Sequence, residues 1–467
     1  MINNELIEKL LSLLQSKQYG AVKTLVQDMN EVDVAEAIEE IFEENEEPET
    51  LLRLFRLLPK ETAAETFAYM HSDVQQKLVE MLSDTELGYI LDDMYLDDYV
   101  DLVEEMPANV VKKLMQVSSP ENRKLINEYL RYPEDSAGSL MTNEYVYLKP
   151  RLTVSQAFDV IRNTGIDKET IYTCYVIENK KLIYTCYVIS GEKQLEGVVT
   201  IRELLLADPN AKVGDIMNTN VIHAHTLDDR EEVAKLFSKY DMISLPVVDN
   251  EERLVGIITV DDAVDVLQEE NTEDFEKMAG MAPSEEEYLK TPIWKLAKNR
   301  IVWLVILMLS SMITGAMLEH FEAAIAAIPL LVSFIPMLMD TGGNSGTQAS
   351  TMVIRGLALD EIEPRDAARV WFKEIRVALL VSAGLALINF ARIAIQYHDV
   401  AVAAIVSLTL IATVCIAKSL GCLLPMLAKK LKLDPALMAT PILTTVTDAA
   451  SILVYFTLTM NILGDRL

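Results

Sequence analysis

The spacing of apolar residues changes near residue 290, and this change divides the chain into two halves. Before it, apolar positions mostly recur every three or four residues in short runs, which is typical of amphipathic helices. After it, apolar stretches approach the roughly 20 residues that a membrane-spanning helix needs. These stretches are 301–318, 323–339, 376–396, 400–428 and 439–463. The pattern predicts a membrane domain, 291–467, with five transmembrane helices.

The second stretch is short and runs into MDTGGNSGTQ, which predicts an irregular break in the helix there. Lys and Arg residues precede the first stretch and follow the second and fourth, whereas the links after the first and third have none. The positive-inside rule then places the N-terminus in the cytoplasm and the C-terminus outside. The chain starts with an amphipathic helix that carries charges throughout, unlike a signal peptide, so we expect the soluble half in the cytosol.

Residues 1–131 show helical spacing in short segments, separated by turn signals such as Pro48, Pro59 and Pro107. A string of short helix pairs predicts an all-α superhelical domain. Within it, Asp97 and Asp101 stand at i and i+4, where like charges cost a few tenths of a kcal/mol. A cation between them would remove that cost, although a solvated acidic face explains the same spacing.

An internal repeat follows. SLMTN at 139–143 returns as DIMNT at 215–219, and GVVTIREL at 197–204 returns as GIITVDDA at 256–263. Each unit reads as a helix, a short strand, a strand–turn–strand segment and a second helix. The repeat resembles a tandem pair of CBS domains, an α/β module that often binds adenine nucleotides. We expect the two units at 132–206 and 207–266.

The first unit contains the strand-like sequence IYTCYVI twice, at 171–177 and 183–189. A CBS unit needs one such strand, so either copy could pair and the register is weakly specified. The other copy must form an extra hairpin or bulge. The duplication suggests no function.

Charge separates the two halves as clearly as hydropathy does. The net charge of the chain is −30, and the first 290 residues hold 59 Asp and Glu against 27 Lys and Arg, whereas the remainder holds 12 against 14. So acidic a soluble half argues against nucleic acid or anionic lipid surfaces as its partner and favours cations. The membrane half is expected to contact lipid.

The acidic residues are densest in the helix expected at the end of the second unit, whose continuation, 267–290, leads to the membrane domain. Lys277 is the single basic residue in the segment 261–280, DDAVDVLQEENTEDFEKMAG. Most contacts at i,i+3 and i,i+4 are therefore between like charges. A divalent cation, which prefers oxygen ligands, would remove this repulsion.

Asp448 lies near the middle of the last apolar stretch, beside Thr444, Thr445 and Thr447. A charge at the centre of a spanning helix costs about 2.5–3.5 kcal/mol on insertion scales, and such residues mostly face an aqueous path or a bundle interior. Two interpretations are open: Asp448 faces an ion pathway, or it forms a structural ion pair with a residue such as Lys418.

Two other residue types suggest little. His223 and His225 stand at i and i+2 on an expected strand, but no third ligand is evident nearby, which weakens a metal site. The four cysteines, 174, 186, 415 and 422, lack metal-site spacing and are expected to be small buried apolar residues.

The order of a helical domain, a CBS pair, an acidic helix and five spans resembles the MgtE family of magnesium transporters. The specific motifs are FIPMLMDTGGNSGTQAS, 334–350, AKSLGCLLP, 417–425, and LDPALMATPILTTVTDAA, 433–450. The resemblance implies a homodimer in the cell membrane with a pore on its two-fold axis, serving magnesium homeostasis. It implies that Asp448 and the backbone at Thr444 recognise a hydrated Mg²⁺ ion, on a path lined by Asn344, Gly342 and Gly343.

The resemblance also gives the acidic half a role. In MgtE-like proteins, cytosolic Mg²⁺ bridges carboxylates of the helical domain, the CBS pair and the acidic "plug" helix, and so closes the pore. Asp434, in the last cytosolic loop, would face the plug. The other residues at matching positions are Glu65, Asp97, Asp101, Asp229, Glu231, Asp241, Asp262, Asp265, Glu270, Glu273 and Asp274.

Asp340 departs from the family pattern, as an added acid before the glycine pair, and the duplicated strand puts nucleotide binding in the first CBS unit in doubt. ATP at the CBS pair is thus an expectation of the resemblance alone. The alternative function is transport of another divalent ion (Co²⁺, Mn²⁺ or Ca²⁺) under control of an adenine nucleotide. The sequence contains neither HExxH nor GxSxG, which argues against an intramembrane enzyme.

Overall fold

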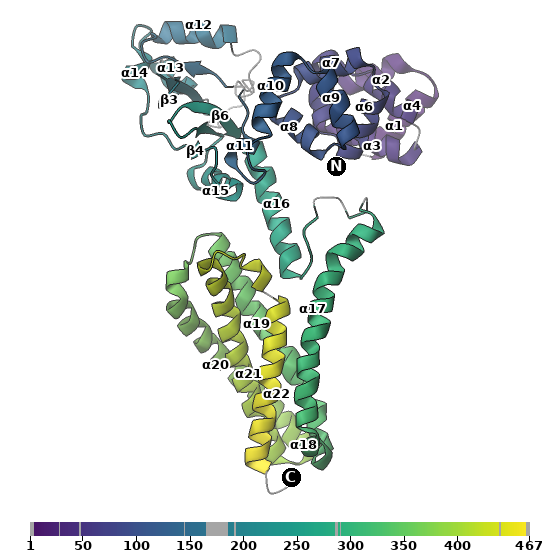
Figure 1. Ribbon diagram of the computed structural model, residues 1–467, viewed down its shortest axis with the longest axis vertical. Helices are drawn as coiled ribbons and strands as arrows, with labels where there is room; N and C mark the ends of the chain where they lie inside the picture. The colour runs from purple at the N-terminus through teal and green to yellow at the C-terminus, as the bar shows by residue number, and fades with distance from the viewer. Residues whose placement is uncertain are drawn as a thin grey trace. The chain divides into compact units, whose positions relative to one another are not determined.

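The computed structural model describes residues 4–27, 29–45, 48–143, 145–164, 185–190, 193–284, 288–289, 291–438 and 440–463. The chain forms two compact units, Met1–Leu267 and Gln268–Leu467. The helix α16 (Val260–Met278) belongs to both. The predicted fold class is confirmed: a helical domain, a CBS-like α/β pair and a helical region with long apolar helices (Figure 1).

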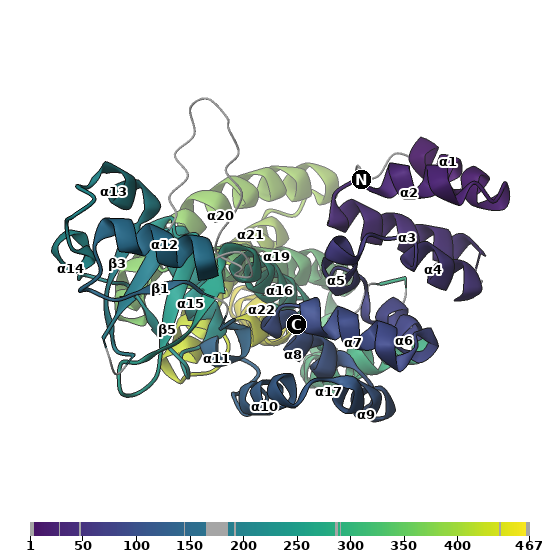
Figure 2. The ribbon, with the colours of Figure 1, turned by 90° about the horizontal axis from the view of Figure 1, so that it is seen from above.

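The first unit opens with short helices that pack on their neighbours along the chain, as α3 does on α4, and on the second helix along, as in the contacts of α3 with α5, α5 with α7 and α7 with α9. Figure 2 shows them as successive layers. The turn residues seen in the sequence end and start these helices. Ser83, for example, forms a capping box with Glu86. The helices are α1 (Asn4–Gln15), α2 (Tyr19–Gln27), α3 (Glu31–Asn45), α4 (Pro48–Phe55), α5 (Lys60–Ala68), α6 (Ser72–Met81), α7 (Asp84–Asp93), α8 (Leu96–Glu105), α9 (Ala108–Val117) and α10 (Pro120–Tyr129).

Two three-stranded sheets follow, in the orders β1-β2-β3 and β4-β5-β6. In each, the first strand is parallel and the third antiparallel to the middle strand. The strands are β1 (Tyr147–Leu148), β2 (Thr185–Ile189), β3 (Leu195–Thr200), β4 (Ala224–His225), β5 (Ser244–Val248) and β6 (Leu254–Thr259). Their helices are α11 (Ala137–Leu140), α12 (Val154–Thr164), α13 (Ile201–Leu206), α14 (Val213–Ile216) and α15 (Arg230–Tyr240).

The repeated motifs hold the two sheets together. Each methionine of the repeat lies against the glycine of the opposite sheet: a Cβ on Gly256 would approach the Met141 sulfur to 2.7 Å, and one on Gly197 the Met217 sulfur to 2.8 Å. Backbone bridges join Thr142 to the strand β6 and Asn218 to β3. The start of each unit therefore completes the sheet of the other.

The strand β2 comes from the second copy of the duplicated sequence, since Thr185–Ile189 pairs with β3. The first copy, 171–177, lies outside the described residues.

The second unit is a bundle in which α19, α21 and α22 pack on one another, α20 on α21, and α17 on α22. Four of its described helices have the length and hydropathy of a membrane span: Ile293–His320, Pro364–Tyr397, Val400–Lys430 and Ile442–Leu463. The elements are α17 (Ile293–His320), α18 (Glu322–Ala327), η1 (Pro329–Phe334), α19 (Ile335–Ala358), η2 (Pro364–Asp366), α20 (Ala367–Tyr397), α21 (Val400–Lys430), η3 (Ala436–Met438) and α22 (Thr440–Leu463).

The break predicted at MDTGGNSGTQ is wrong. The helix α19 runs unbroken through it, and the interruption lies earlier, at η1. The glycines stay helical because they allow close packing, as small residues do between membrane helices. A Cβ on Gly421 of α21 would overlap the carbonyl oxygen of Gly346, so the two backbones meet there.

Replacing Gly421 by Ala should destabilise this bundle, because the new Cβ has no room beside Gly346 and would lie 3.2 Å from the Ala349 Cβ. Overpacking of this kind costs about 1–3 kcal/mol. We expect a lower thermal unfolding midpoint for the purified protein in detergent. The matched control is Gly384→Ala in α20, where a Cβ meets nothing within 4 Å and the midpoint should hold or rise. Equal midpoints for Gly421→Ala and the unsubstituted chain would contradict the close approach of α19 and α21.

Candidate ion sites

Seven carboxylates gather where the helix α8 and the start of α16 carry adjacent aspartates. We call this set the α8–α16 cluster. Asp97 is its most enclosed member, with 7% of its surface exposed, and its Oδ1 has no hydrogen-bond partner among the described residues. A buried carboxylate oxygen without a partner costs folding free energy. The cluster comprises Asp97, Asp98 and Asp101 of α8, Asp261, Asp262 and Asp265 of α16, and Glu65 of α5.

Burial and mutual repulsion disfavour the ionised forms in this cluster. Burial, then the charges of Asp101 and Asp262, raise the pKa of Asp98 to about 7. Burial and the charge of Asp97 raise the pKa of Asp262 to about 7, although the Thr259 hydroxyl donates to Asp262 Oδ2 over 2.6 Å and opposes the shift. Burial is also the main reason that the pKa of Asp97 lies well above its usual range. A cation would offset both causes.

The apolar faces of the two helices place these acids. Tyr99, Val100 and Val103 of α8 are buried in the hydrophobic core, as are Ala263 and Val266 of α16. The aspartates that adjoin these buried residues in the sequence therefore lie at the edge of the core. The ligand set that the resemblance implies leaves out Asp98 and Asp261, each of which adjoins a member of that set in an Asp-Asp pair. Those pairs were the available signal.

The predicted ligands of the second CBS unit have other tasks. Asp229 caps α15 by accepting from the amides of Glu231 and Glu232. The Glu231 carboxylate pairs with Lys235 at 2.8 Å. Asp241 ends α15 in a left-handed conformation. The structure therefore does not join these three predicted ligands to the α8–α16 cluster.

Further along α16, Lys277 connects the acidic helix to the loop before α22. Its Nζ lies 2.6 Å from Asp434 Oδ2 and also pairs with Glu273. Burial alone would lower the pKa of Lys277, but the hydrogen bonds to Asp434 and Glu273 outweigh it and raise the pKa. Asp434 thus contacts the acidic helix through a lysine. Glu270 and Asp274 lie on the same helix.

In the bundle, Asp448 is half-buried on α22. The alternative of a structural pair with Lys418 is not what the structure contains, because Lys418 Nζ lies 3.3 Å from Glu374 Oε2. The glycines of α19 face the threonines beside Asp448. A Cβ on Gly343 would lie 3.3 Å from the Thr444 methyl, and one on Gly342 would lie 2.9 Å from the Thr447 methyl.

The helix α19 also carries polar residues outward. Asp340, Asn344 and Gln348 follow one another at i, i+4 and i+8 and are exposed in the single chain. Side chains at this spacing form one stripe along a helix. Lipid would be a poor solvent for such a stripe.

A cavity of about 470 Å³ lies between the two CBS units. The residues that line it include Tyr187, Tyr240, Asn220 and Asp241. Mostly apolar walls with a few polar groups are typical of small-molecule sites.

Comparison with known proteins agrees with this organisation. A family model described as a divalent cation transporter matches residues 335–458, one for the MgtE intracellular N domain matches 29–135, and one for CBS domains matches 137–210 and 213–269. The magnesium transporter MgtE of Thermus thermophilus is 36% identical over 85% of this chain and 86% of its own. That of Bacillus subtilis is 31% identical over 98% of this chain and 97% of its own.

Among solved structures, the soluble part is similar to the cytosolic domain of the Mg²⁺ channel MgtE in complex with ATP. The two are 34% identical, with a TM-score of 0.50, over 56% of this chain and 99% of the other. The soluble part of another magnesium transporter is 28% identical, with the same TM-score, over 57% of this chain and 98% of the other.

The raised pKa values predict a pH dependence of local stability. The pKa of Asp98 and Asp262 is about 7 in the folded chain and about 4 when unfolded, so the folded state binds more protons between these values. Stability of α8 should therefore fall as pH rises from about 4 to 7. Hydrogen exchange of α8 in the full chain, corrected for intrinsic rates and without divalent cations, measures it.

Asp98→Asn combined with Asp262→Asn should flatten this dependence, and Mg²⁺ should restore protection above pH 7 in the unsubstituted chain. The control is Asp93→Asn, an exposed carboxylate at the end of α7. Protection of α8 that rises with pH would show that these acids are not destabilised by ionisation.

Proposed function

Since the chain belongs to the MgtE family of magnesium transporters, we propose that it forms a Mg²⁺-selective, channel-like path for influx, closed by cytosolic Mg²⁺. The observation that carries the proposal is a pair of carboxylate sites in one chain. Asp448 lies inside the membrane bundle, and the α8–α16 cluster lies in the soluble unit. The first provides a place for the ion in transit and the second a place for the ion that regulates it.

We assign five spans, with α19 as the fifth beside the four helices of high hydropathy, the N-terminus in the cytoplasm and the C-terminus outside. The stripe Asp340, Asn344 and Gln348 on α19 supports a homodimer, because a second copy across a two-fold axis would enclose the stripe around water.

The path itself would run beside α19 and α22, on the side that the second copy closes. Asp448 and the backbone at Thr444 would face it from α22, and Asn344 would face it from α19. Gly342 and Gly343 are buried against threonines, so they would line the path only through a rearrangement of this packing. Mg²⁺ dehydrates reluctantly and binds through one or two carboxylates while it keeps several waters. One carboxylate per subunit among hydroxyls and glycines suits such a hydrated ion.

Closure would follow from the chemistry of the α8–α16 cluster. At high cytosolic Mg²⁺, ions neutralise the cluster and hold α16 against α8. As Mg²⁺ falls, repulsion returns and α16 is released. Its far end then changes its ion pairs with the loop of Asp434, where Glu270, Glu273 and Asp274 offer further oxygen ligands to a cation. Asp229 and Glu231 would join only by leaving their present partners, and Asp241 would join only by a movement of the end of α15.

The cavity between the CBS units supports a second proposal, that ATP or a related adenine nucleotide binds there and tunes the closure. Its size suits a purine, Tyr240 is among its lining residues, and a relative's cytosolic domain was solved in complex with ATP. This feature also keeps open the alternative of another divalent cargo under nucleotide control. Competition by Co²⁺, Mn²⁺ or Ca²⁺ for Mg²⁺ influx separates the two cargoes.

Asp448→Asn should abolish Mg²⁺ influx, because it removes the charge on which recognition depends. The measurement is influx into proteoliposomes that contain an Mg²⁺-sensitive dye and very low internal Mg²⁺. The control is Asp360→Asn, an exposed residue outside the expected spans whose left-handed conformation Asn tolerates. Influx through Asp448→Asn equal to that of the unsubstituted chain would place the path elsewhere.

Asp97→Asn combined with Asp262→Asn should release the closure, because the cluster then repels less and binds Mg²⁺ more weakly. The unsubstituted chain should lose most of its influx at millimolar internal Mg²⁺, whereas the double variant should retain it. Asp93→Asn is again the control. If both proteins respond alike to internal Mg²⁺, the cluster is not the regulatory site.

A further inference from the structure

We propose that His223, His225 and Glu252 form a binding site for a first-row transition cation of the Zn²⁺ class on the second CBS unit. The inference is independent of the proposed gating. Among the described residues, only these three bring ligand atoms of His, Cys, Asp or Glu to within 4.8 Å of one another as a group. The sequence pattern alone had not supplied the third ligand, because Glu252 comes from a different turn.

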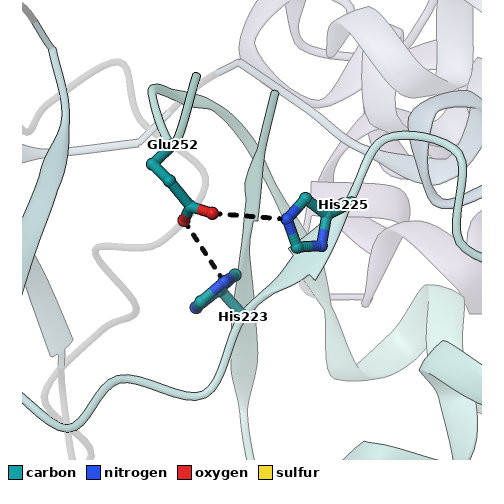
Figure 3. Close-up of side chains that lie close together, drawn as sticks. All are labelled: His223, His225 and Glu252. Atoms are coloured by element: carbon teal, nitrogen blue, oxygen red, sulfur yellow. Dashed lines mark ion pairs between the residues drawn. The ribbon is translucent and has the colours of Figure 1, made fainter. Parts of the chain in front are cut away.

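The distances fit a common ion. His223 Nε2 lies 3.5 Å from Glu252 Oε2, and His225 Nε2 lies 3.5 Å from Glu252 Oε1 (Figure 3). Ligands at about 2.0–2.1 Å from a tetrahedral Zn²⁺ stand roughly 3.4 Å from each other. A direct N–H···O hydrogen bond would instead close to about 2.9 Å. Both distances are longer than a direct hydrogen bond, and the three ligand atoms all lie within 4.8 Å of one another, so an ion can lie between the groups.

The outward nitrogens have partners that orient both rings. His223 Nδ1 lies 3.2 Å from the carbonyl oxygen of Val221 and can donate a hydrogen bond to it. Nε2 then carries the free lone pair that can bind a metal. His225 Nδ1 lies 3.7 Å from Asp228 Oδ2, which is itself fixed by the His225 amide at 2.8 Å. Carbonyl and carboxylate partners of this kind are typical of metal-bound histidines.

The turn that presents Glu252 is held from several sides. The Asp249 carboxylate accepts from the amides of Glu251 and Arg253, and the Glu252 carbonyl accepts from the Leu195 amide. Glu252 has a φ of 60°, in the left-handed region that favours glycine. A glutamate in this conformation has more backbone strain than a glycine would have.

The first CBS unit provides an internal comparison. Its register aligns Val188 with Gly197 as the second unit aligns Val247 with Gly256. On this alignment, the positions of His223, His225 and Glu252 are those of Tyr147, Lys149 and Lys193. Lys193 has the same left-handed backbone, with a φ of 66°. The same fold therefore forms with other residues at all three positions. Folding alone does not require His223, His225 and Glu252 in the second unit.

The ligand chemistry selects the ion. Two imidazoles and one carboxylate suit Zn²⁺, Co²⁺ or Ni²⁺, whereas Mg²⁺ prefers oxygen ligands alone. The three side chains are 30%, 43% and 57% exposed, so an ion can enter from solvent and a water can complete a tetrahedral shell. Metal binding needs the neutral form of an imidazole, so protons compete with the ion.

The experiment measures Zn²⁺ binding by the full chain in detergent, by competition with a chromophoric chelator, with saturating Mg²⁺ present to occupy sites made of oxygen ligands. We expect one site per chain that disappears in the variant His223→Ala with His225→Ala. Glu252→Gln should weaken it at least about tenfold, and Asp228→Asn should weaken it about 10- to 100-fold. Co²⁺ at the site should give a tetrahedral d–d absorption spectrum that the double histidine variant lacks.

The matched control is Lys193→Gln, the same turn position in the first unit, which should leave Zn²⁺ affinity unchanged. Glu252 and Lys193 are exposed, so these two variants compare binding without disturbing a core. Equal affinity and stoichiometry in the unsubstituted chain, Glu252→Gln and the double histidine variant would overturn the proposal. So would a loss of binding in Lys193→Gln as large as that in Glu252→Gln.

Discussion

Repulsion between carboxylates that packing forces together is the constraint on which the soluble unit depends. The apolar faces of α8 and α16 contribute to one core, and this packing brings Asp97, Asp98 and Asp262 into surroundings where ionisation is unfavourable. The hydrophobic gain fixes the helices, and the electrostatic cost makes their junction sensitive to protons and cations. Bound protons or cations would reduce this cost.

The fold could be predicted from the sequence because its signals are local. Turn residues end the short helices, the repeat defines the α/β pair, and apolar length marks the spanning helices. The break at the glycine pair could not be predicted, because a glycine's effect on a helix depends on what packs against it. Gly346 stays helical because Gly421 of α21 lies directly against it. The sequence gives no sign of that contact.

The candidate sites were predictable to the same extent. Asp448 and the Asp-rich segments can be recognised from composition. A charge among apolar residues has few structural explanations, and the same holds for a run of like charges. The partners of each group depend on tertiary contacts instead. Lys418 pairs with Glu374 rather than with Asp448, and Asp229 caps a helix. Glu252 reaches the two histidines because β4 pairs with β5, whose following turn carries it.

The continuity of α16 has a mechanical consequence. Its 19 residues make a rod about 28 Å long, with Asp262 near one end and Lys277 near the other. A helix of this length bends little, so it acts as a lever. A tilt of about 5° at the aspartate end would displace the lysine end sideways by roughly 2.5 Å. A sideways displacement of that size is comparable to the 2.6 Å that separates Lys277 Nζ from Asp434 Oδ2, so it would disrupt this ion pair.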